Sequence, residues 1–596
     1  MVSDYTPPPV TQATLKGAPS VTVSPVGLAQ GLPRNNNANY GPDTPGTTTC
    51  GINEAAVSLG SVGGKLCLLE GTFTVSSTVF IPPRVAVIGA GRGSTVITSA
   101  TPGIGYMVTL NAATDSEISG VTLDMNDIAG ASALFFTGAC SRIRVHNCIF
   151  KGQYDTWLIQ FNSNGLSSSS PPTAYCQDVR IDHNEIFGGC SKSGGSLENV
   201  ILSAAVNCYV DDNTIYVNQV SESMYICAFY DYTRGCRFGD NRILVAQNIG
   251  GIFYDSDGLF NDFAENYIET RTGSTNAIGQ VVKLLTASIG LSVRGNVVNG
   301  LNGYGPNANT VGQFINIVSA PAPAVVNGSG GPDGNVSQNA GYVDYLIVEG
   351  NCVVGAYTIL TIMGSQNQVA NSWTFKNNVW ATLAATAFDN GGTLRGFSCI
   401  GGIGGQIDYS NNTDISDLLV LNSSNVGVGI GIAVFSGWST ATINGNRFAI
   451  AKNNVAGSSY NNVQLSSITN LQFRGNVIGG SGTATLIGYY SLTSIGAGLV
   501  EGNIRGDTGH PLNQGFSVTT PAFPATATNV QNTNPFSVRI YLLTAGAGTA
   551  FTITDPAGNV QAITVALAAG MEFTLDPGAQ IQFTYTTAPT WKWYGI

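Results

Sequence analysis

Charged residues are scarce in this sequence: Asp, Glu, Lys and Arg make up 10% of its 596 residues, where about 25% is usual. The 24 basic residues form no patch and the formal net charge is −11, which excludes an electrostatic surface for nucleic acid. No apolar run approaches the roughly 18 residues of a membrane span. The opening stretch, MVSDYTPPPV, also lacks the basic and apolar regions of a secretion signal.

Histidine is rare, with 3 residues, and several catalytic motifs are missing. The sequence has no Gly-x-Ser-x-Gly elbow, no phosphate loop and no dinucleotide fingerprint. Its 11 cysteines are an odd number, so at least one thiol is unpaired within the chain. Their C-x7-C and C-x8-C spacings match no zinc pattern.

Apolar residues and glycine are plentiful, at 43% of the chain and 75 residues respectively. This composition excludes a disordered chain and allows a large core. The surface must then consist mainly of neutral polar groups, since so few residues are charged. Such a surface favours a protein that works outside a cell or on the surface of a virion.

The pattern apolar-any-any-Asn-any-apolar recurs at intervals of 25 to 34 residues and once at 55. Cys148 occupies an earlier position of the series, and Asn327 would supply a member inside the long interval. A repeat of this length without a helical period is typical of a solenoid. The asparagines of the series are Asn184, Asn213, Asn241, Asn266, Asn296, Asn351, Asn378, Asn412, Asn446, Asn476 and Asn503.

Each repeat contains about three short strand-like runs, which predicts a single-stranded parallel β-helix with rungs about 4.8 Å apart. We expect the asparagines to occupy sharp bends, because Asn tolerates left-handed backbone geometry. Stacked asparagines also hydrogen-bond along the axis. The cysteines follow the same register: Cys140 and Cys176 lie eight residues before the column, and Cys208 and Cys236 lie five before it. They predict a buried ladder of small side chains, with disulfides between neighbouring rungs as the alternative.

Residues 63–97, GGKLCLLEGTFTVSSTVFIPPRVAVIGAGRGSTVI, resemble the opening rungs of the pectate-lyase-like right-handed β-helix family, which includes viral tailspikes and polysaccharide-degrading enzymes. The resemblance covers roughly residues 46–510 and implies a right-handed coil. Apolar residues at 52, 55, 56 and 59 predict a short helix that caps the open end of the solenoid. The Gly-His-Gly typical of polygalacturonases is absent, so that activity is not implied.

The remaining segments define the other predicted domains of an all-β protein. Residues 1–45 are proline-rich and predict an extended N-terminal arm, and residues 511–535 predict a linker. Residues 536–596 contain hairpin-like runs separated by the turns DPAGN and DPG, which predict a small C-terminal β-sandwich. By analogy with tailspike-like proteins, this sandwich would assemble a homotrimer.

Two Phe-Tyr-Asp motifs, at 229–231 and 253–255, raise the question of a catalytic pair. Asp231 lies ten residues before its column asparagine and Asp255 eleven before its own, so we expect them on adjacent rungs, about 5 Å apart. That separation suits a retaining glycosidase, and Asp257 offers the wider spacing of an inverting one. The alternative is ordinary turn chemistry, in which an aspartate ends a strand.

Sugar-binding and metal-binding residues are also predicted around these motifs. Tyr230, Tyr232 and Tyr254 could stack on sugar rings, and Arg234 could hold an acidic sugar. A stripe of acidic residues precedes the asparagine column at Asp212, Asp240 and Glu265. These carboxylates either share a Ca²⁺ ion or splay into water; no other cofactor is expected.

The resemblance implies a viral tailspike or fibre protein that recognises a host cell-surface polysaccharide and attaches to other virion proteins through its N-terminal arm. If it is an enzyme, it is a glycoside hydrolase or polysaccharide lyase. Two alternatives remain open: an extracellular polysaccharide hydrolase or lyase that is not attached to a virion, and a structural surface protein without catalysis.

Overall fold

The fold is described from a computed structural model. It describes the chain apart from residues 1–17, 28–36, 127–130, 153–156, 162–171, 189–197, 218–224, 231, 257, 272–277, 286–287, 301–310, 319–342, 344, 364–371, 382–396, 401–404, 416, 421–429, 449, 454–459, 479–487, 506–515, 535 and 596. The chain forms two compact units, treated separately below. The first is Met1–Thr374 with Asn378–Ala387 and Gly396–Ser398, and the second is Phe375–Asn377 with Phe388–Arg395 and Cys399–Ile596.

The first unit begins with the predicted cap. Helix α1, Ile52–Ser58, buries Ile52, Ala55 and Ala56. It packs against strands β1, β2 and β4 (Val79–Ile81). Strand β1, Ser20–Val23, pairs in parallel with β2, Gly64–Leu68. This part of the predicted arm is therefore a strand of the solenoid. In the part of the chain that the structure describes, no helix is long and apolar enough to cross a membrane.

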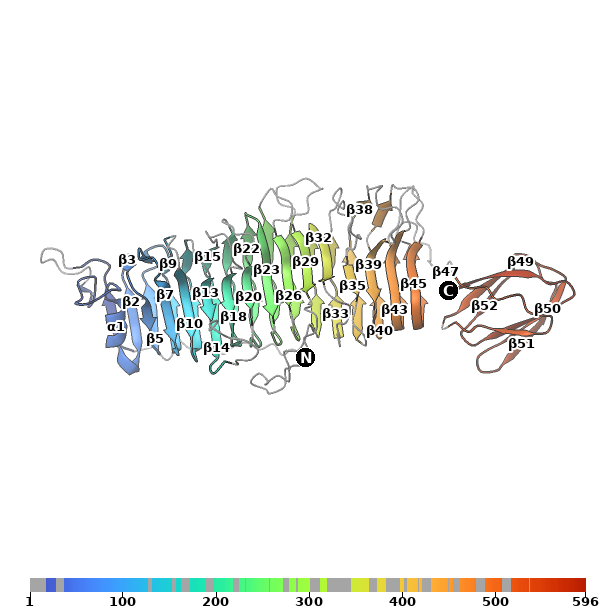
Figure 1. Ribbon diagram of the computed structural model, residues 1–596, viewed down its shortest axis with the longest axis horizontal. Coiled ribbons are helices and arrows are strands. Elements are labelled where there is room, and N and C mark those ends of the chain that lie inside the picture. Colours follow the sequence, from blue (N-terminus) through green and yellow to red (C-terminus); the bar gives the residue numbers. More distant parts are fainter. Residues whose placement is uncertain are drawn as a thin grey trace. The chain divides into compact units, whose positions relative to one another are not determined.

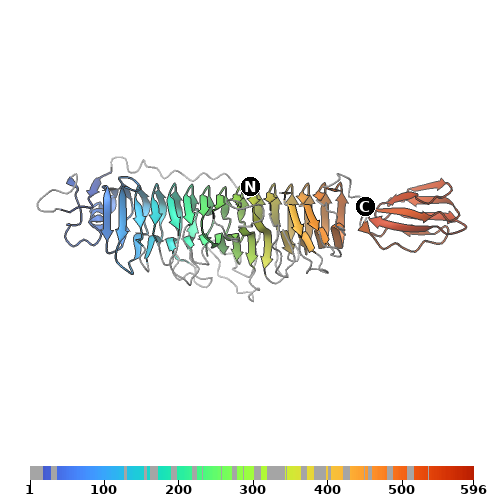
Figure 2. The ribbon, with the colours of Figure 1, turned by 90° about the horizontal axis from the view of Figure 1, so that it is seen from above.

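The rungs of the first unit are built from parallel strands on three flanks (Figures 1 and 2). Flank A contains β7 (Gly105–Asn111), β10 (Ala131–Thr137), β13 (Trp157–Phe161), β16 (Glu198–Leu202), β20 (Tyr225–Phe229), β23 (Ile249–Ser256), β26 (Ile278–Leu285), β29 (Val311–Val318) and β32 (Ala356–Met363). Flank B contains β2, β5 (Val85–Gly89), β8 (Thr114–Ser119), β11 (Ser141–His146), β14 (Cys176–Asp182), β18 (Tyr209–Asp211), β21 (Arg237–Gly239), β24 (Asp262–Ala264), β27 (Ser292–Arg294) and β30 (Leu346–Glu349). Flank C contains β3 (Gly71–Val75), β6 (Thr95–Ser99), β9 (Thr122–Asp124), β12 (Ile149–Lys151), β15 (Glu185–Gly188), β19 (Thr214–Val217), β22 (Arg242–Val245), β25 (Tyr267–Thr270), β28 (Val297–Asn299), β31 (Cys352–Val354) and β34 (Val379–Ala381). The predicted parallel β-helix with three strands per rung is confirmed.

The asparagine column links these rungs as predicted, with one correction. Asn296 donates directly to Asn351 Oδ1, at 3.0 and 2.9 Å, so the 55-residue interval is a single turn and the prediction of a further member at Asn327 is wrong. In Asn241, the backbone N–H and the side-chain Nδ2 both donate to Oδ1 of Asn266, at 3.1 Å each. The same Nδ2 donates to the carbonyl of Val210 on the preceding rung, at 2.9 Å. The first member, Asn184, accepts a hydrogen bond from the backbone N–H of Cys148, which confirms the place of Cys148 in the series.

The left-handed bend lies one residue before each asparagine, which corrects the prediction that the asparagine itself makes the bend. The preceding residues Asp212, Asp240 and Glu265 have φ values of 54°, 53° and 59°. The asparagine turns inward instead, because its amide must pair buried backbone groups of the preceding rung, as Asn241 does with Asn213 N–H and Val210 O. Its role is hydrogen bonding and not tolerance of positive φ.

Inside the coil, stacked apolar side chains form a continuous core. Phe238 and Phe263 on adjacent flank B strands stack with their ring centroids 6.0 Å apart, and Phe253 lies 5.0 Å from Phe263. The predicted ladder of small buried side chains is confirmed among the described residues, since six of the cysteines are buried. The six buried cysteines are Cys140, Cys148, Cys176, Cys208, Cys227 and Cys236.

The second unit contains further rungs and the C-terminal sandwich. Its rungs include β36 (Gln406–Ser410), β37 (Thr413–Asp414), β38 (Asp417–Val420), β39 (Ile430–Ser436), β40 (Thr440–Asn444), β41 (Arg447–Phe448), β42 (Ile450–Asn453), β43 (Tyr460–Arg474), β44 (Val477–Ile478), β45 (Gly488–Glu501) and β46 (Ile504–Arg505). Asn412, Asn446, Asn476 and Asn503 continue the hydrogen-bonded column there.

The C-terminal sandwich is present, and it is larger than predicted. One sheet contains β47 (Phe516–Ser517), β54 (Thr590–Gly595), β49 (Val538–Thr544) and β52 (Glu572–Leu575), and the other contains β48 (Asn529–Gln531), β53 (Gln580–Tyr585), β50 (Gly548–Thr554) and β51 (Val560–Thr564). Residues 516–534, predicted within the linker, therefore belong to the sandwich. Their prolines accept hydrogen bonds from core aromatics: Trp591 Nε1 donates to Pro521 O at 2.8 Å, and the Tyr585 hydroxyl donates to Pro524 O at 2.6 Å.

Candidate functional site

The two Phe-Tyr-Asp motifs lie on neighbouring strands of flank A, but not in equivalent positions. Strand β20 pairs with β23 so that Phe229 lies beside Asp255 and Ala228 beside Tyr254. Residues paired between the two strands are 26 positions apart in sequence (255 − 229). The two Phe-Tyr-Asp motifs are only 24 positions apart (255 − 231), so equivalent motif residues do not pair. The expectation of aspartates at matching places on adjacent rungs is therefore wrong. Asp231 and Asp257 lie outside the described residues.

Asp255 is buried in a polar network and is fully inaccessible to solvent. Its Oδ1 accepts a hydrogen bond from Asn261 Nδ2 at 2.9 Å, and its Oδ2 accepts one from the Ser288 hydroxyl. Asn261 also donates to Thr233 Oγ1 at 3.0 Å and accepts from the backbone N–H of Cys236 at 3.0 Å. This arrangement supports the turn between flanks A and B. A carboxylate held in this way does not reach a polysaccharide on the surface.

The alternation of the strand explains these positions. Asp255 pairs on its other side with Leu284, a buried residue, so Asp255 occupies a column that faces the interior. Tyr254 lies on the opposite, outward face. The aspartate of this motif therefore lies inside the coil and the tyrosine outside it.

The predicted tyrosines divide into two groups. Tyr254 and Tyr230 form a patch with Tyr225 and Ala228 on the outer face of β20 and β23, which we call the tyrosine patch. Tyr232 adopts a left-handed conformation, with φ 64°, in the turn that follows β20, and is largely buried. Arg234 lies in the same turn, where its backbone N–H donates to Ala205 O at 2.9 Å. Neither Tyr232 nor Arg234 is a member of the patch.

Within the tyrosine patch, the rings contact one another in a chain. The ring centroids of Tyr225 and Tyr254 are 5.3 Å apart, and those of Tyr230 and Tyr254 are 5.2 Å apart. Tyr225 and Tyr254 are 8% and 9% exposed, so they form the floor of the patch, and half-buried Tyr230 packs against them. Adjacent aromatic rings on a rigid sheet present the apolar faces and hydroxyl groups that sugar rings contact.

Gly251 allows Tyr225 to lie across the sheet. A Cβ atom at this position would lie 2.4 Å from Cε1 of Tyr225 and 2.7 Å from the carbonyl oxygen of Gln280. Tyr225 therefore passes over Gly251, its partner on the next rung, and its hydroxyl lies 3.3 Å from Gln280 Oε1, two rungs away. Tyr225 is absent from the predicted site. The adjacent glycines at 250 and 251 are the available sequence signal for this close approach.

Lys283 completes the patch from β26. Its Nζ atom lies 5.6 Å from the ring centroids of both Tyr225 and Tyr254, which is a cation–π arrangement. Burial lowers the pKa of the Lys283 ammonium group. No spacing rule could have found this residue, because it is a lone lysine in an otherwise apolar strand.

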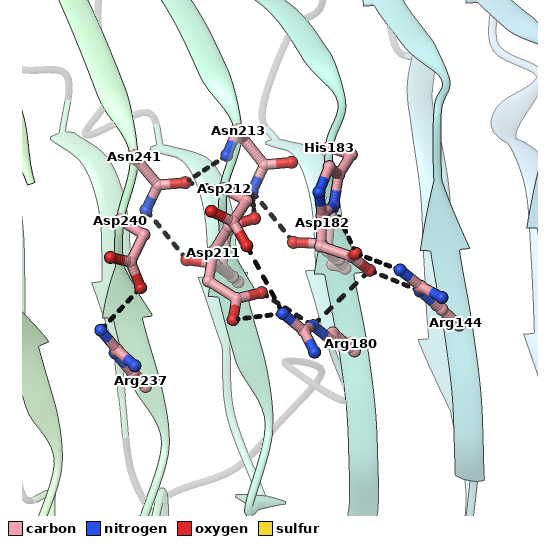
Figure 3. A network of polar contacts seen from close by, with 12 residues as sticks. Arg144, Arg180, Asp182, His183, Asp211, Asp212, Asn213, Arg237, Asp240 and Asn241 are labelled. Carbon is pink, nitrogen blue, oxygen red and sulfur yellow. Dashed lines mark hydrogen bonds and ion pairs between the residues drawn. The ribbon is translucent and has the colours of Figure 1, made fainter. Parts of the chain in front are cut away.

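A second polar cluster, the ion-pair stack, runs along the outer face of flank B (Figure 3). Arg144 binds both oxygens of Asp182, at 2.9 and 2.6 Å, and Arg180 binds both oxygens of Asp211, at 3.1 and 3.0 Å. Asp182 and Asp211 are neighbours in the register of β14 and β18. The exposed imidazole of His183 contacts Asp182 through Nδ1 at 2.7 Å.

The pKa values of the two neighbouring carboxyl groups in the ion-pair stack, Asp211 and Asp182, are shifted in opposite directions. Burial raises the pKa of Asp211 to about 6, because desolvation and the charges of Asp182 and Asp212 outweigh Arg180. Burial also raises the pKa of Asp182, but hydrogen bonds from Arg144 and His183 lower it by more, so the net shift is downward. Opposite shifts are typical of acid–base pairs. Here, however, both side chains are buried and bound to guanidinium groups, which is the pattern of a structural ion pair.

The predicted acidic stripe borders the ion-pair stack. Arg237 binds Asp240 at 2.7 Å and also binds Glu265, and Arg180 lies 3.5 Å from Asp212. Guanidinium groups therefore offset the repulsion that led to the prediction of a shared Ca²⁺ ion. Among the described residues, no group of three or more His, Cys, Asp or Glu side chains is arranged to hold a metal.

Together, the fold and this surface define a parallel β-helix protein with an aromatic, lysine-containing patch on one flank. No protein-family model and no curated protein matches the sequence. Among solved structures, the tailspike protein of Escherichia coli bacteriophage HK620, in complex with a pentasaccharide, is similar with 10% identity and a TM-score of 0.45, over 91% of this chain and 88% of that one. The A-module of the Azotobacter vinelandii mannuronan C-5 epimerase AlgE6 is similar with 13% identity and a TM-score of 0.31, over 76% and 94%. Similarity at this level carries no argument about activity.

Proposed function

We propose that the protein binds a polysaccharide and that the tyrosine patch is part of its binding surface. The observation that carries this proposal is the contact chain of Tyr230, Tyr254 and Tyr225 on an outward sheet face, with Lys283 beside it. Three adjacent rungs hold these side chains at fixed spacing, so the surface is formed before a ligand arrives. Preorganised aromatic surfaces lose little conformational entropy on binding.

The finer form of the proposal is a tailspike or fibre protein that recognises a polysaccharide on a host cell surface. Three features support it: the resemblance of residues 63–97 to the tailspike-containing family, the neutral polar composition, and the presence of a C-terminal sandwich. In this reading the sandwich assembles a homotrimer and the N-terminal segment attaches the protein to the virion. Light scattering on the full chain tests the assembly, and a monomer would count against the spike.

Cleavage of the polysaccharide, by hydrolysis or by elimination, is a separate question. Asp255 is withdrawn as a catalytic group, because it is buried and hydrogen-bonded. Asp231 and Asp257, which lie outside the described residues, remain the proposed acids. Incubation with a bound polysaccharide, followed by assays for new reducing ends and for unsaturated uronates, distinguishes a hydrolase from a lyase and both from a binding protein. If these aspartates are the catalytic acids, the substitutions Asp231→Asn and Asp257→Asn should abolish cleavage. Cleavage that survives both substitutions would exclude them.

The binding proposal is tested by screening polysaccharides from bacterial envelopes with the full chain and then comparing variants. Tyr230→Ala and Tyr254→Ala should each weaken binding by about tenfold or more, as expected for an aromatic contact residue. Tyr267→Ala is the matched control, because Tyr267 is 37% exposed on flank C, away from the patch. Equal affinities for the patch variants and this control would refute a role for the patch.

A further inference from the structure

Lys283 differs from the arginines of flank B, because no carboxylate of the described residues pairs with it. Arg144, Arg180 and Arg237 each contact one or more carboxylates on flank B. Among the described residues, no ion pair involves Lys283, although its side chain is half-buried and nearby charges do not shift its pKa. A half-buried ammonium group with only aromatic neighbours lacks the compensation that buried charges normally have.

Two hydrogen-bond acceptors without partners lie next to this lysine. Asn316 follows Lys283 in the same outward column on β29, and it is 1% exposed with an Oδ1 atom that has no hydrogen-bond partner. Gln313, also on β29, follows Gln280 in the adjacent outward column, and its buried Oε1 atom likewise has no partner. Buried acceptors of this kind normally receive a hydrogen bond. The two rungs therefore offer one uncompensated cation and two unfilled acceptors.

We infer that Lys283, Asn316 and Gln313 form a subsite for an acidic sugar, in which Lys283 binds a carboxylate and the two amide oxygens accept hydrogen bonds from sugar hydroxyl groups. A uronic acid residue carries both kinds of group on one ring. A neutral sugar would fill the acceptors but leave the lysine without a counter-ion. The inference rests on the proposed function of the tyrosine patch and specifies its ligand as an acidic polysaccharide.

The subsite also explains the arrangement of the aromatic residues. The Lys283 ammonium group lies over the rings of both Tyr225 and Tyr254, 5.6 Å from each centroid. This contact fixes the charged group without neutralising it, so the charge remains available for an anion. Gly251 permits the arrangement, because any larger residue would displace the Tyr225 ring.

The first test measures binding of the full chain to polygalacturonate, to its methyl-esterified neutral form and to dextran sulfate, at low and high salt. We expect tighter binding to polygalacturonate than to the ester, with a preference of about tenfold or more that salt reduces. Lys283→Met should remove the preference and Lys283→Arg should retain much of it. Lys151→Met is the control, since Lys151 pairs with Asp124 at 2.9 Å on flank C.

The outcomes separate this inference from the proposed function. If Tyr254→Ala weakens binding while Lys283→Met leaves the acid-to-ester preference unchanged, the patch binds glycans but the acidic subsite is wrong. If the protein instead prefers dextran sulfate over polygalacturonate, and this preference depends on Lys283, the anion at the subsite is a sulfate. That result would overturn the assignment of a uronic acid.

A second measurement does not depend on finding the natural polymer. The rate of reductive methylation of Lys283 is followed in the presence of galacturonate oligomers or of neutral galactose oligomers. We expect the acidic oligomers to protect Lys283 and not Lys151, and the neutral oligomers to protect neither. Absence of this selective protection would overturn the inference, even if every polymer in the first test failed to bind.

Discussion

The asparagine column makes a specific prediction for the substitution Asn241→Ala. In the native chain, Oδ1 of Asn241 accepts from the backbone N–H and Nδ2 of Asn213, at 3.0 and 3.1 Å. Its own Nδ2 donates to Val210 O and to Asn266 Oδ1. Alanine removes these four bonds. The buried backbone N–H of Asn213 loses its acceptor and the carbonyl of Val210 loses a donor, whereas Nδ2 of Asn213 still donates to the carbonyls of Ile181 and Asp211. Each buried unsatisfied group costs about 1–3 kcal/mol, so we expect a loss of about 3–5 kcal/mol in the free energy of unfolding.

The effect should be local as well as global, because each rung contacts only its neighbours. Thermal unfolding followed by circular dichroism measures the overall loss, and hydrogen exchange at the Asn213 amide measures the local one. A loss of about 1.4 kcal/mol corresponds to tenfold faster exchange, so that amide should exchange at least tenfold faster than in the native protein. Gln247→Ala, at an exposed position after β22, is the control. A variant Asn241→Ala as stable as this control would refute the reasoning that the column is an obligatory hydrogen-bond ladder.

Three further predictions follow from the same structure. Gly251→Val should displace the Tyr225 ring, since even its Cβ would lie 2.4 Å from that ring, and binding assays should show glycan affinity reduced about as much as in Tyr225→Ala. Asp255→Ala should lower the free energy of unfolding by about 1–3 kcal/mol, because Asn261 and Ser288 lose their acceptor, and calorimetry should show the resulting lower melting temperature at saturating glycan as well. The pKa of Asp211 is raised from 3.8 to about 6 in the folded protein, so protonation of Asp211 stabilises the fold at low pH. This contribution, up to about 3 kcal/mol, is lost as the pH rises from about 4 to 6. Asp211→Asn should therefore flatten that part of the stability profile, measured by unfolding at several pH values, whereas an unchanged slope would contradict the assigned shift.

The stacked coil could be predicted from sequence because its strongest constraint leaves the same residue at successive turns from Asn184 onward. The buried amide pairs backbone groups of the preceding rung and the amide of the next one, and asparagine has the right length with both a donor and an acceptor. Even Asn412 and Asn503, which match the pattern poorly, join the column in the second unit. The small buried thiols, the capping helix at Ile52–Ser58 and the C-terminal sandwich were predictable for similar reasons, since each depends on local composition and period.

The candidate site was predictable only in part, because it depends on register. Asp231 and Asp255 differ by 24 residues, whereas β20 and β23 pair with a shift of 26. The turns between flanks vary in length, so identical motifs need not face one another. Tyr225 could not be predicted for the same reason. It contacts Tyr254, 29 positions away in sequence (254 − 225), and its hydroxyl lies near Gln280, 55 positions away (280 − 225).

The separation of inward and outward columns explains how one solenoid carries both a rigid core and a specific surface. Asp255 and Tyr254 are adjacent in sequence, yet one fills a buried turn network and the other forms the floor of the tyrosine patch. Because the asparagine column fixes the rungs, a side chain on an outward column has neighbours about 4.8 Å above and below it. The half-buried Lys283 lies over two tyrosine rings in this way, and the described residues supply no ion-pair partner for it. In the subsite proposed above, a single cation placed by three rungs would select the sugar although the surface carries few charges.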